Sequence, residues 1–115
     1  MAPARPTIST HVLDLVSGDP AEGVAVTLFR LDASGAPQLL SELTTDADGR
    51  IRDLLQGATL TAGEYQLAFD VGGYADEEED FFQSIALALH VVDVQRSYHV
   101  PLLLSPFGMT TYRGS

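Results

Sequence analysis

The last four residues bring several groups capable of chemistry to one place in the chain. Tyr112 supplies a phenol, Arg113 a guanidinium, and Ser115 both a hydroxyl and the terminal carboxylate, with Gly114 between the last two. They follow an alternating apolar run and a turn over residues 105–108, so a strand would deliver them. Ser115 lacks the Gly-x-Ser-x-Gly context of a hydrolase nucleophile, and we expect it to position a bound molecule rather than attack it.

Two of the three histidines could act as acid–base groups, because histidine has an ordinary pKa near neutrality. His11 lies in an alternating, β-branched run, and His99 lies in a second such run near the end of the chain. The alternative for each is a histidine of the core or the surface, and position in a run does not distinguish the two. His90 shares a strand face with Ala88 and Val92, and we expect it to be structural.

Arg50 is placed by a turn at Asp48-Gly49 at the start of the next expected strand. Its guanidinium could hold an oxyanion or a carbonyl oxygen with two parallel donors, which a lysine could not reproduce. The alternative is an exposed charge that neutralises the nearby carboxylates of Asp46, Asp48 and Asp53.

A metal site is not expected. Zinc usually takes three or four closely spaced ligands, whereas the histidines are residues 11, 90 and 99 and the chain has no cysteine. The acidic turn over residues 46–49 invites comparison with a calcium loop. With Gly49 in the sixth position, however, Thr44 and Leu55 would occupy the first and twelfth, and neither carries a carboxylate. We interpret this segment as a hairpin turn.

Length and composition indicate one domain. A chain of 115 residues with 45% hydrophobic residues can build a single core without disulfides. Residues 1–6, which include two prolines, are expected to form a flexible tail, and residues 7–115 the domain. The net charge of −10 and the absence of lysine disfavour nucleic acid and anionic membranes as partners. No apolar run approaches spanning length and the first residues lack a secretion signal, so we expect a cytoplasmic location.

Short alternating runs separated by turn signals predict an all-β sandwich. The expected strands cover residues 8–16, 24–31, 39–45, 50–52, 64–71, 84–94 and 98–104, with an eighth around residues 110–111. One short helix is expected over residues 75–82, where the acidic run 76–80 would favour the start of a helix.

The pleat of these strands determines which side chains could meet. On the first strand it places His11 on one face with Ser9 and Leu13, and on the seventh it places His99 on one face with Leu103. A proline also lies on the latter face, at position 101, and because proline has no N–H it predicts an edge or a bulge there.

Three motifs occur in order along the chain. They are Thr-His-Val-Leu-Asp at residues 10–14, Asp-Gly-Arg at residues 48–50, and Tyr-His-Val-Pro-Leu-Leu-Leu-Ser-Pro at residues 98–106 followed by the terminal Tyr-Arg-Gly-Ser. Together they resemble the transthyretin-like 5-hydroxyisourate hydrolase family, from about residue 8 to residue 115. The terminal tetrapeptide alone would be a weak signal, whereas the ordered set is specific.

The resemblance implies a transthyretin-like sandwich of two four-stranded sheets, assembled as a homotetramer (a dimer of dimers) with pockets between dimers. It implies hydrolysis of the small molecule 5-hydroxyisourate, an oxidised purine of urate degradation, with no cofactor. The implied catalytic residues are His11, Arg50 and His99, and the implied substrate-binding residues are those of the terminal tetrapeptide, 112–115. The two histidines would be the water-activating base and its partner, in an order that the sequence leaves open.

Two departures from the family pattern and two alternative functions remain. Members often have His-Tyr-His where this chain has Ser97-Tyr-His99, and Phe-Phe-Pro-Glu where residues 81–84 are Phe-Phe-Gln-Ser. Since Ser97 shares a strand face with His99, the first difference could change the proton network.

The alternative functions are a non-catalytic, transthyretin-like carrier of an aromatic small molecule and a β-sandwich interaction module. The set of histidine, arginine and terminal tetrapeptide argues against both.

Overall fold

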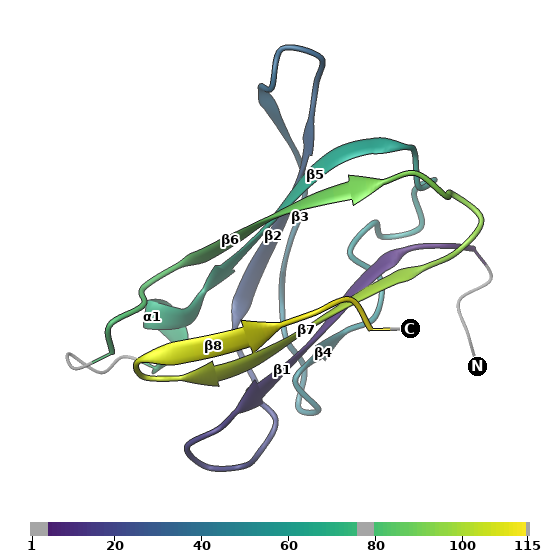
Figure 1. Ribbon diagram of the computed structural model, residues 1–115. Helices are drawn as coiled ribbons and strands as arrows, with labels where there is room; N and C mark the ends of the chain where they lie inside the picture. The colour runs from purple at the N-terminus through teal and green to yellow at the C-terminus, as the bar shows by residue number, and fades with distance from the viewer. Residues whose placement is uncertain (1–4, 76–79, 115) are drawn as a thin grey trace.

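Two four-stranded sheets stack face to face in the computed structural model, which describes residues 5–75 and 80–114 (Figure 1). One sheet has the order β4-β1-β7-β8 and the other the order β3-β2-β5-β6. The strands are β1 (Ile8–Asp14), β2 (Ala25–Leu31), β3 (Pro37–Thr44), β4 (Arg50–Ile51), β5 (Gly63–Asp70), β6 (Ile85–Val91), β7 (Tyr98–Ser105) and β8 (Gly108–Thr111). The predicted all-β sandwich is confirmed, including the short fourth and eighth strands.

The core lies between the sheets and is built by the alternation seen in the sequence. On β5, Tyr65, Leu67 and Phe69 are buried, and the residues between them are exposed or half-buried. On β1, Thr10 and Val12 are buried in the same way. Each fully buried large apolar side chain stabilises the fold by about 1.5–3 kcal/mol relative to an exposed one. This one-sided burial leaves the outer face of each sheet available for other contacts.

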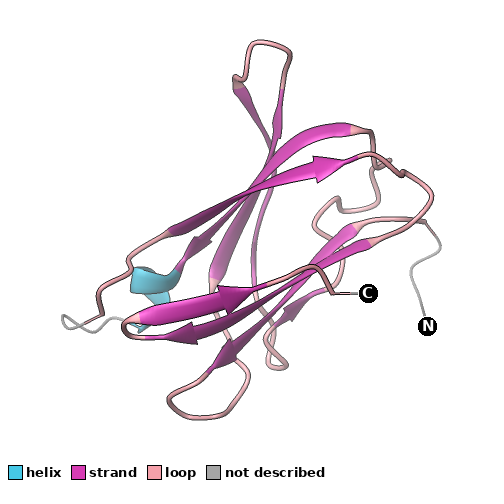
Figure 2. Cartoon of the chain, viewed as in Figure 1, coloured by secondary structure: helices cyan, strands magenta, loops and turns pink. Residues whose placement is uncertain are grey.

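The helix α1 (Val71–Ala75) lies directly after β5 at one end of the sandwich (Figure 2). The Oδ1 atom of Asp70 accepts a hydrogen bond from the N–H of Gly73 (2.9 Å), so Asp70 caps the helix start. The sequence interpretation was therefore wrong in two respects. The helix begins at Val71, before the expected start at residue 75, and residues 80–82 are not helical. Most of the predicted acidic helix, residues 76–79, lies outside the described residues.

Pro101 lies in an internal strand, contrary to the prediction of an edge or a bulge. β7 runs parallel to β1 and antiparallel to β8, and its register with β1 is continuous through Pro101. β8 ends at Thr111, opposite Leu102, and pairing with β7 resumes only at the bridge between His99 and Gly114. Pro101 thus falls opposite a gap in the ladder, where no N–H is needed.

No helix within residues 5–75 and 80–114 is long and apolar enough to span a membrane. The first four residues of the expected tail are outside the described part of the chain, so the flexibility of residues 1–6 stays a prediction.

Candidate active site

Three neighbouring strands bring the predicted catalytic residues onto the outer face of one sheet. His11 on β1 is the Cα partner of Arg50 on β4 and of Pro101 on β7. His99 lies two residues before Pro101 on β7, opposite Ser9. All three predicted catalytic side chains are half-buried. We call this surface, formed by Ser9, His11, Arg50 and His99, the site face.

The ring of His99 is held from both sides. Its Nδ1 atom lies 2.8 Å from the Oγ atom of Ser9, within hydrogen-bonding distance. On the other side, its Cδ2 atom would lie only 2.7 Å from a Cβ atom built on Gly114, so this position has no room for a side chain. Nδ1 and Cδ2 lie on the two sides of the ring, and Nε2 at its tip has no hydrogen-bond partner among residues 5–75 and 80–114.

The C-terminal segment lies beside β7 and completes one side of the site face (Figure 1). The N–H of Gly114 donates to the carbonyl oxygen of His99 (2.7 Å). Tyr112 is 55% exposed and Arg113 is also exposed, so both can contact a molecule placed over the sheet. Of the four predicted substrate-binding residues, Gly114 therefore contacts His99, and Ser115 lies outside the described residues.

Arg52, and not Arg50, neutralises the acidic turn. The Nη1 atom of Arg52 lies 2.9 Å from Asp46 Oδ2, and its Nη2 atom lies 3.8 Å from Asp48 Oδ2. Among the residues that the structure describes, no carboxylate lies within 4.0 Å of the Arg50 guanidinium. The alternative of Arg50 as a neutralising surface charge thus loses its support. A turn is present over residues 46–49, with Gly49 in a left-handed conformation (φ 73°) and its N–H donating to the carbonyl oxygen of Asp46 (2.8 Å). The prediction of a hairpin was wrong, because β3 and β4 on either side of the turn belong to different sheets.

The environment of His99 favours a neutral ring. Burial lowers its pKa below the ordinary value of 6.5, and the nearby charges of Arg50 and His11 lower the pKa further. Arg50 and His11 are therefore both close enough to His99 to affect its pKa. A neutral histidine can accept a proton from water while a neighbouring arginine holds a negative oxygen.

His90 and Ser97 lie apart from this constellation. His90 is exposed on β6 of the other sheet, with its Nδ1 atom 3.6 Å from Glu64 Oε1, which fits the structural role expected of it. The Oγ atom of Ser97 accepts a hydrogen bond from the N–H of Thr7 (3.0 Å) and so supports the start of β1. Within the described ranges, no three His, Cys, Asp or Glu side chains are grouped as metal ligands.

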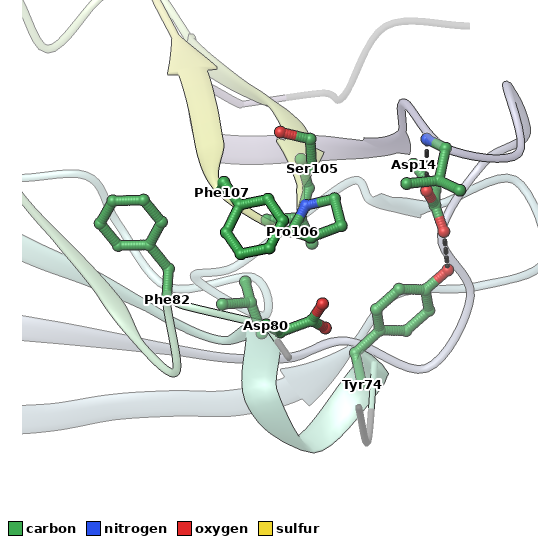
Figure 3. A pocket seen from close by; sticks show the side chains of 10 residues that line it. Asp14, Tyr74, Asp80, Phe82, Ser105, Pro106 and Phe107 are labelled. Carbon is green, nitrogen blue, oxygen red and sulfur yellow. Dashed lines mark hydrogen bonds between the residues drawn. The ribbon is translucent and has the colours of Figure 1, made fainter. Parts of the chain in front are cut away.

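A cavity with a volume of about 500 Å³ lies away from the site face (Figure 3). It is lined by Asp14 and Ser105, at the ends of β1 and β7 away from His99, and by Tyr74 and Phe107. Tyr74 donates a hydrogen bond to Asp14 Oδ2 (2.9 Å), which joins α1 to β1. None of the predicted site residues lines this cavity, and the side chains of the site face are half-buried on the outer surface of their sheet.

A sequence model described as the HIUase/Transthyretin family matches residues 8–114, which include every site residue named above except Ser115. The chain belongs to this family. The resemblance carried by the three motifs is thereby confirmed.

Members of this family have different activities, and three of them are informative here. The 5-hydroxyisourate hydrolase of Mesorhizobium japonicum is 43% identical over 115 residues, covering 94% of this chain and 91% of its own. The structure of Klebsiella pneumoniae 5-hydroxyisourate hydrolase is 37% identical, with a TM-score of 0.81, and the match covers 96% of this chain and 94% of that one. Sea bream transthyretin, solved in complex with thyroxine, is 30% identical, with a TM-score of 0.86 and 93% coverage of both chains. The backbone therefore fits hydrolase and carrier alike, and only side chains can distinguish them.

Ser9 is the one residue of the site face that the sequence did not single out. Its place on the same strand face as His11 was visible from the alternation of β1. Its contact with His99 depends on the parallel pairing of β1 and β7, which are 90 residues apart at this point. A run of alternating residues does not specify which distant strand it will pair with, so no sequence signal could have located this contact.

Proposed function

We propose that this chain is a hydrolase that opens the ring of 5-hydroxyisourate, as the names of its most similar relatives suggest. The observation that carries the proposal is the arrangement of His99. Its lowered pKa favours the neutral ring, the ring is held on both sides, and it shares one sheet face with His11 and with an arginine that has no carboxylate partner among the described residues. A carrier of a hydrophobic ligand requires none of these features.

In the proposed reaction, water attacks a ring carbonyl carbon at an amide-like C–N bond. His99 Nε2 accepts a proton from the water as the new C–O bond forms, and Arg50 stabilises the negative charge that develops on the carbonyl oxygen. The intermediate then breaks the C–N bond, and the departing nitrogen takes the proton from the His99 imidazolium. His11, opposite Arg50, would orient the substrate or relay this proton, while Tyr112 and Arg113 would contact the substrate from the side.

The test is ultraviolet monitoring of freshly generated 5-hydroxyisourate with and without the protein. We expect the absorbance of the substrate to decay faster in proportion to protein concentration. Decay at the spontaneous rate, together with saturable binding of an aromatic ligand, would instead favour a transthyretin-like carrier. The TM-score of 0.86 to sea bream transthyretin is the observation that makes the carrier the second candidate.

We further propose that the active form is a homotetramer in which other copies cover the site face. Leu13 and Leu103 are only half-buried on this outer face, beside His11 and His99, which is typical of a surface that meets another subunit. Because the site lies on the outer surface of its sheet, a second copy would supply the walls that exclude water. Light scattering at the assay concentration tests this, and full activity in a monomer would contradict it.

The activity should persist to a lower pH than it would with a base that has the ordinary histidine pKa of 6.5. The pKa of His99 is lowered, so at pH 6.5 more than half of these rings remain neutral and able to accept a proton. We therefore expect the acid limb of kcat/KM to have its midpoint below pH 6.5. A proton NMR titration of the His99 ring should give the same midpoint. Different midpoints in the two measurements would contradict the assignment of His99 as base, and a common midpoint at or above 6.5 would contradict the lowered pKa of His99.

Gly114→Ala should impair turnover without unfolding the protein. The added Cβ would overlap the His99 ring edge, which must then rotate or shift. Misplacement of a catalytic group by about 1 Å can cost about 10²-fold, and we expect kcat to fall by that order. Gly108→Ala is the matched control, because its Cβ would meet only Ser105 Oγ, at an ordinary 3.6 Å. Similar kcat values for the two variants would show that the C-terminal segment does not position His99.

A further inference from the structure

We propose that Ser9 is a positioning residue for the reaction proposed above. Its hydroxyl would hold the His99 ring in the rotation and the tautomer that leave the Nε2 lone pair free to accept a proton. The inference rests on the proposed function for its kinetic part, and on the geometry of Ser9 and His99 for its structural part.

The register of the sheet brings Ser9 and His99 together. They are Cα partners in the parallel pairing of β1 with β7, and neighbouring strands lie about 4.8 Å apart, so side chains on one face meet directly. Both residues are half-buried on the site face. The 2.8 Å between Ser9 Oγ and His99 Nδ1 is a full hydrogen bond. Ser9 is also the only side chain of the described residues that is hydrogen-bonded to the ring of His99.

The contact fixes the rotation of the ring. If the ring flipped by 180°, Nδ1 would leave Ser9 and would instead face Gly114, which offers only a crowded backbone position there. The flip would therefore break this hydrogen bond, and no side chain of Gly114 could replace it. Ser9 on one side and Gly114 on the other thus select a single orientation, with Nε2 at the tip.

A hydroxyl can either donate to Nδ1 or accept from Nδ1–H, and the role proposed for Ser9 requires that it accept. When Nδ1–H donates to Ser9 Oγ, Nε2 keeps its lone pair and can accept a proton from water. After Nε2 has taken that proton, the ring still donates from Nδ1 to the same oxygen, so one contact serves both forms of the base. The opposite tautomer would have Nε2 protonated and unable to accept.

A hydroxyl partner differs from a carboxylate partner in its effect on the base. A carboxylate at Nδ1 would stabilise the imidazolium and raise the pKa of the ring, whereas a neutral hydroxyl orients the ring without adding charge. The charged and titratable groups around the His99 ring likewise add no negative charge. Arg50 faces His99 from β4, His11 faces it from β1, and Arg113 precedes Gly114 in the C-terminal segment. Within residues 5–75 and 80–114, no carboxylate lies within 4.0 Å of His99.

The experiment compares Ser9→Ala, Ser9→Thr and Ser97→Ala with the unaltered chain. We expect Ser9→Ala to lower kcat by about 10- to 100-fold while KM changes less than about threefold, because it removes orientation and not substrate contact. Ser9→Thr keeps the hydroxyl on a residue suited to a strand and should restore most of kcat. Ser97 lies two residues from His99 but is hydrogen-bonded to Thr7, so the kcat of Ser97→Ala should stay within about twofold of the unaltered value.

A second readout does not depend on turnover. The ¹⁵N chemical shifts of His99 report which ring nitrogen carries the hydrogen. We expect the Nδ1–H form in the unaltered chain and in Ser9→Thr, and a mixture of tautomers in Ser9→Ala. Thermal unfolding of each variant shows that the comparison is made on folded protein.

The possible results separate the two proposals. Absence of turnover in the unaltered chain would overturn the proposed function, and the ¹⁵N shifts would still test the role of Ser9. With an active chain, unchanged kcat in Ser9→Ala would overturn the inference. The inference would also be overturned if Ser9→Ala had the same His99 tautomer as the unaltered chain, whatever the change in kcat. Ser9 would then not determine the tautomer.

Discussion

His99→Gln is expected to lower kcat for ring opening by about 10²–10⁴-fold, the usual contribution of a positioned acid–base group. Glutamine can still hydrogen-bond to Ser9 across the sheet, but it cannot accept a proton from water at neutral pH. The fold should be retained, because His99 points away from the core between the sheets. The measurement is steady-state turnover of freshly generated 5-hydroxyisourate, accompanied by the circular dichroism spectrum of the β-sheets.

The matched control for this prediction is His90→Gln. His90 is an exposed strand histidine of the other sheet, paired only loosely with Glu64 at 3.6 Å. We expect its kcat to stay within about twofold of the unaltered value. If His99→Gln retained comparable turnover, the base would have to be His11 or a residue outside the site face, and the proposed mechanism would fail.

Local patterns in the sequence were sufficient to predict the strands. The alternation in residues 8–14 and 64–69 reflects burial of every second side chain, and the structure buries Tyr65, Leu67 and Phe69 as that pattern requires. The helix was misplaced because the glycine pair 72–73 is a strong turn signal, whereas the cap that starts the helix is a single aspartate, Asp70. Tertiary packing of Val71, which is buried, outweighs the low helix propensity of glycine.

The candidate site was predicted from residue types, but its geometry was not. Whether His11 and His99 share a face depends on which strands pair, and the parallel pairing of β1 with β7 joins segments from opposite ends of the chain. The prediction from Pro101 was wrong because a missing N–H usually indicates an edge, whereas the structure accommodates Pro101 at a gap between the end of β8 and Gly114. Such a gap is a property of the paired strands together, so one strand's sequence cannot reveal it.

Arg50 and Arg52 provide a natural comparison, because they lie two residues apart and differ in what they contact. Arg52 pairs with Asp46 and Asp48 at the surface, where an ion pair typically contributes about 0–1 kcal/mol. Arg50 is half-buried beside the two histidines, and its charge lowers the pKa of His99. A guanidinium in this position can present two parallel donors to one developing oxyanion, a geometry that an ammonium group cannot form.

Arg50→Lys should therefore lower kcat by about 10²–10³-fold although the charge is kept, which is the typical cost of removing one preorganised donor from an oxyanion. KM should change less, because the second donor matters most when charge develops. Arg52→Lys should keep near-normal turnover, since an exposed lysine can still pair with Asp46. The measurement is kcat and KM for both variants on freshly generated 5-hydroxyisourate. Near-normal kcat in Arg50→Lys would mean that positive charge alone suffices, and the two-donor role assigned to Arg50 would have to be abandoned.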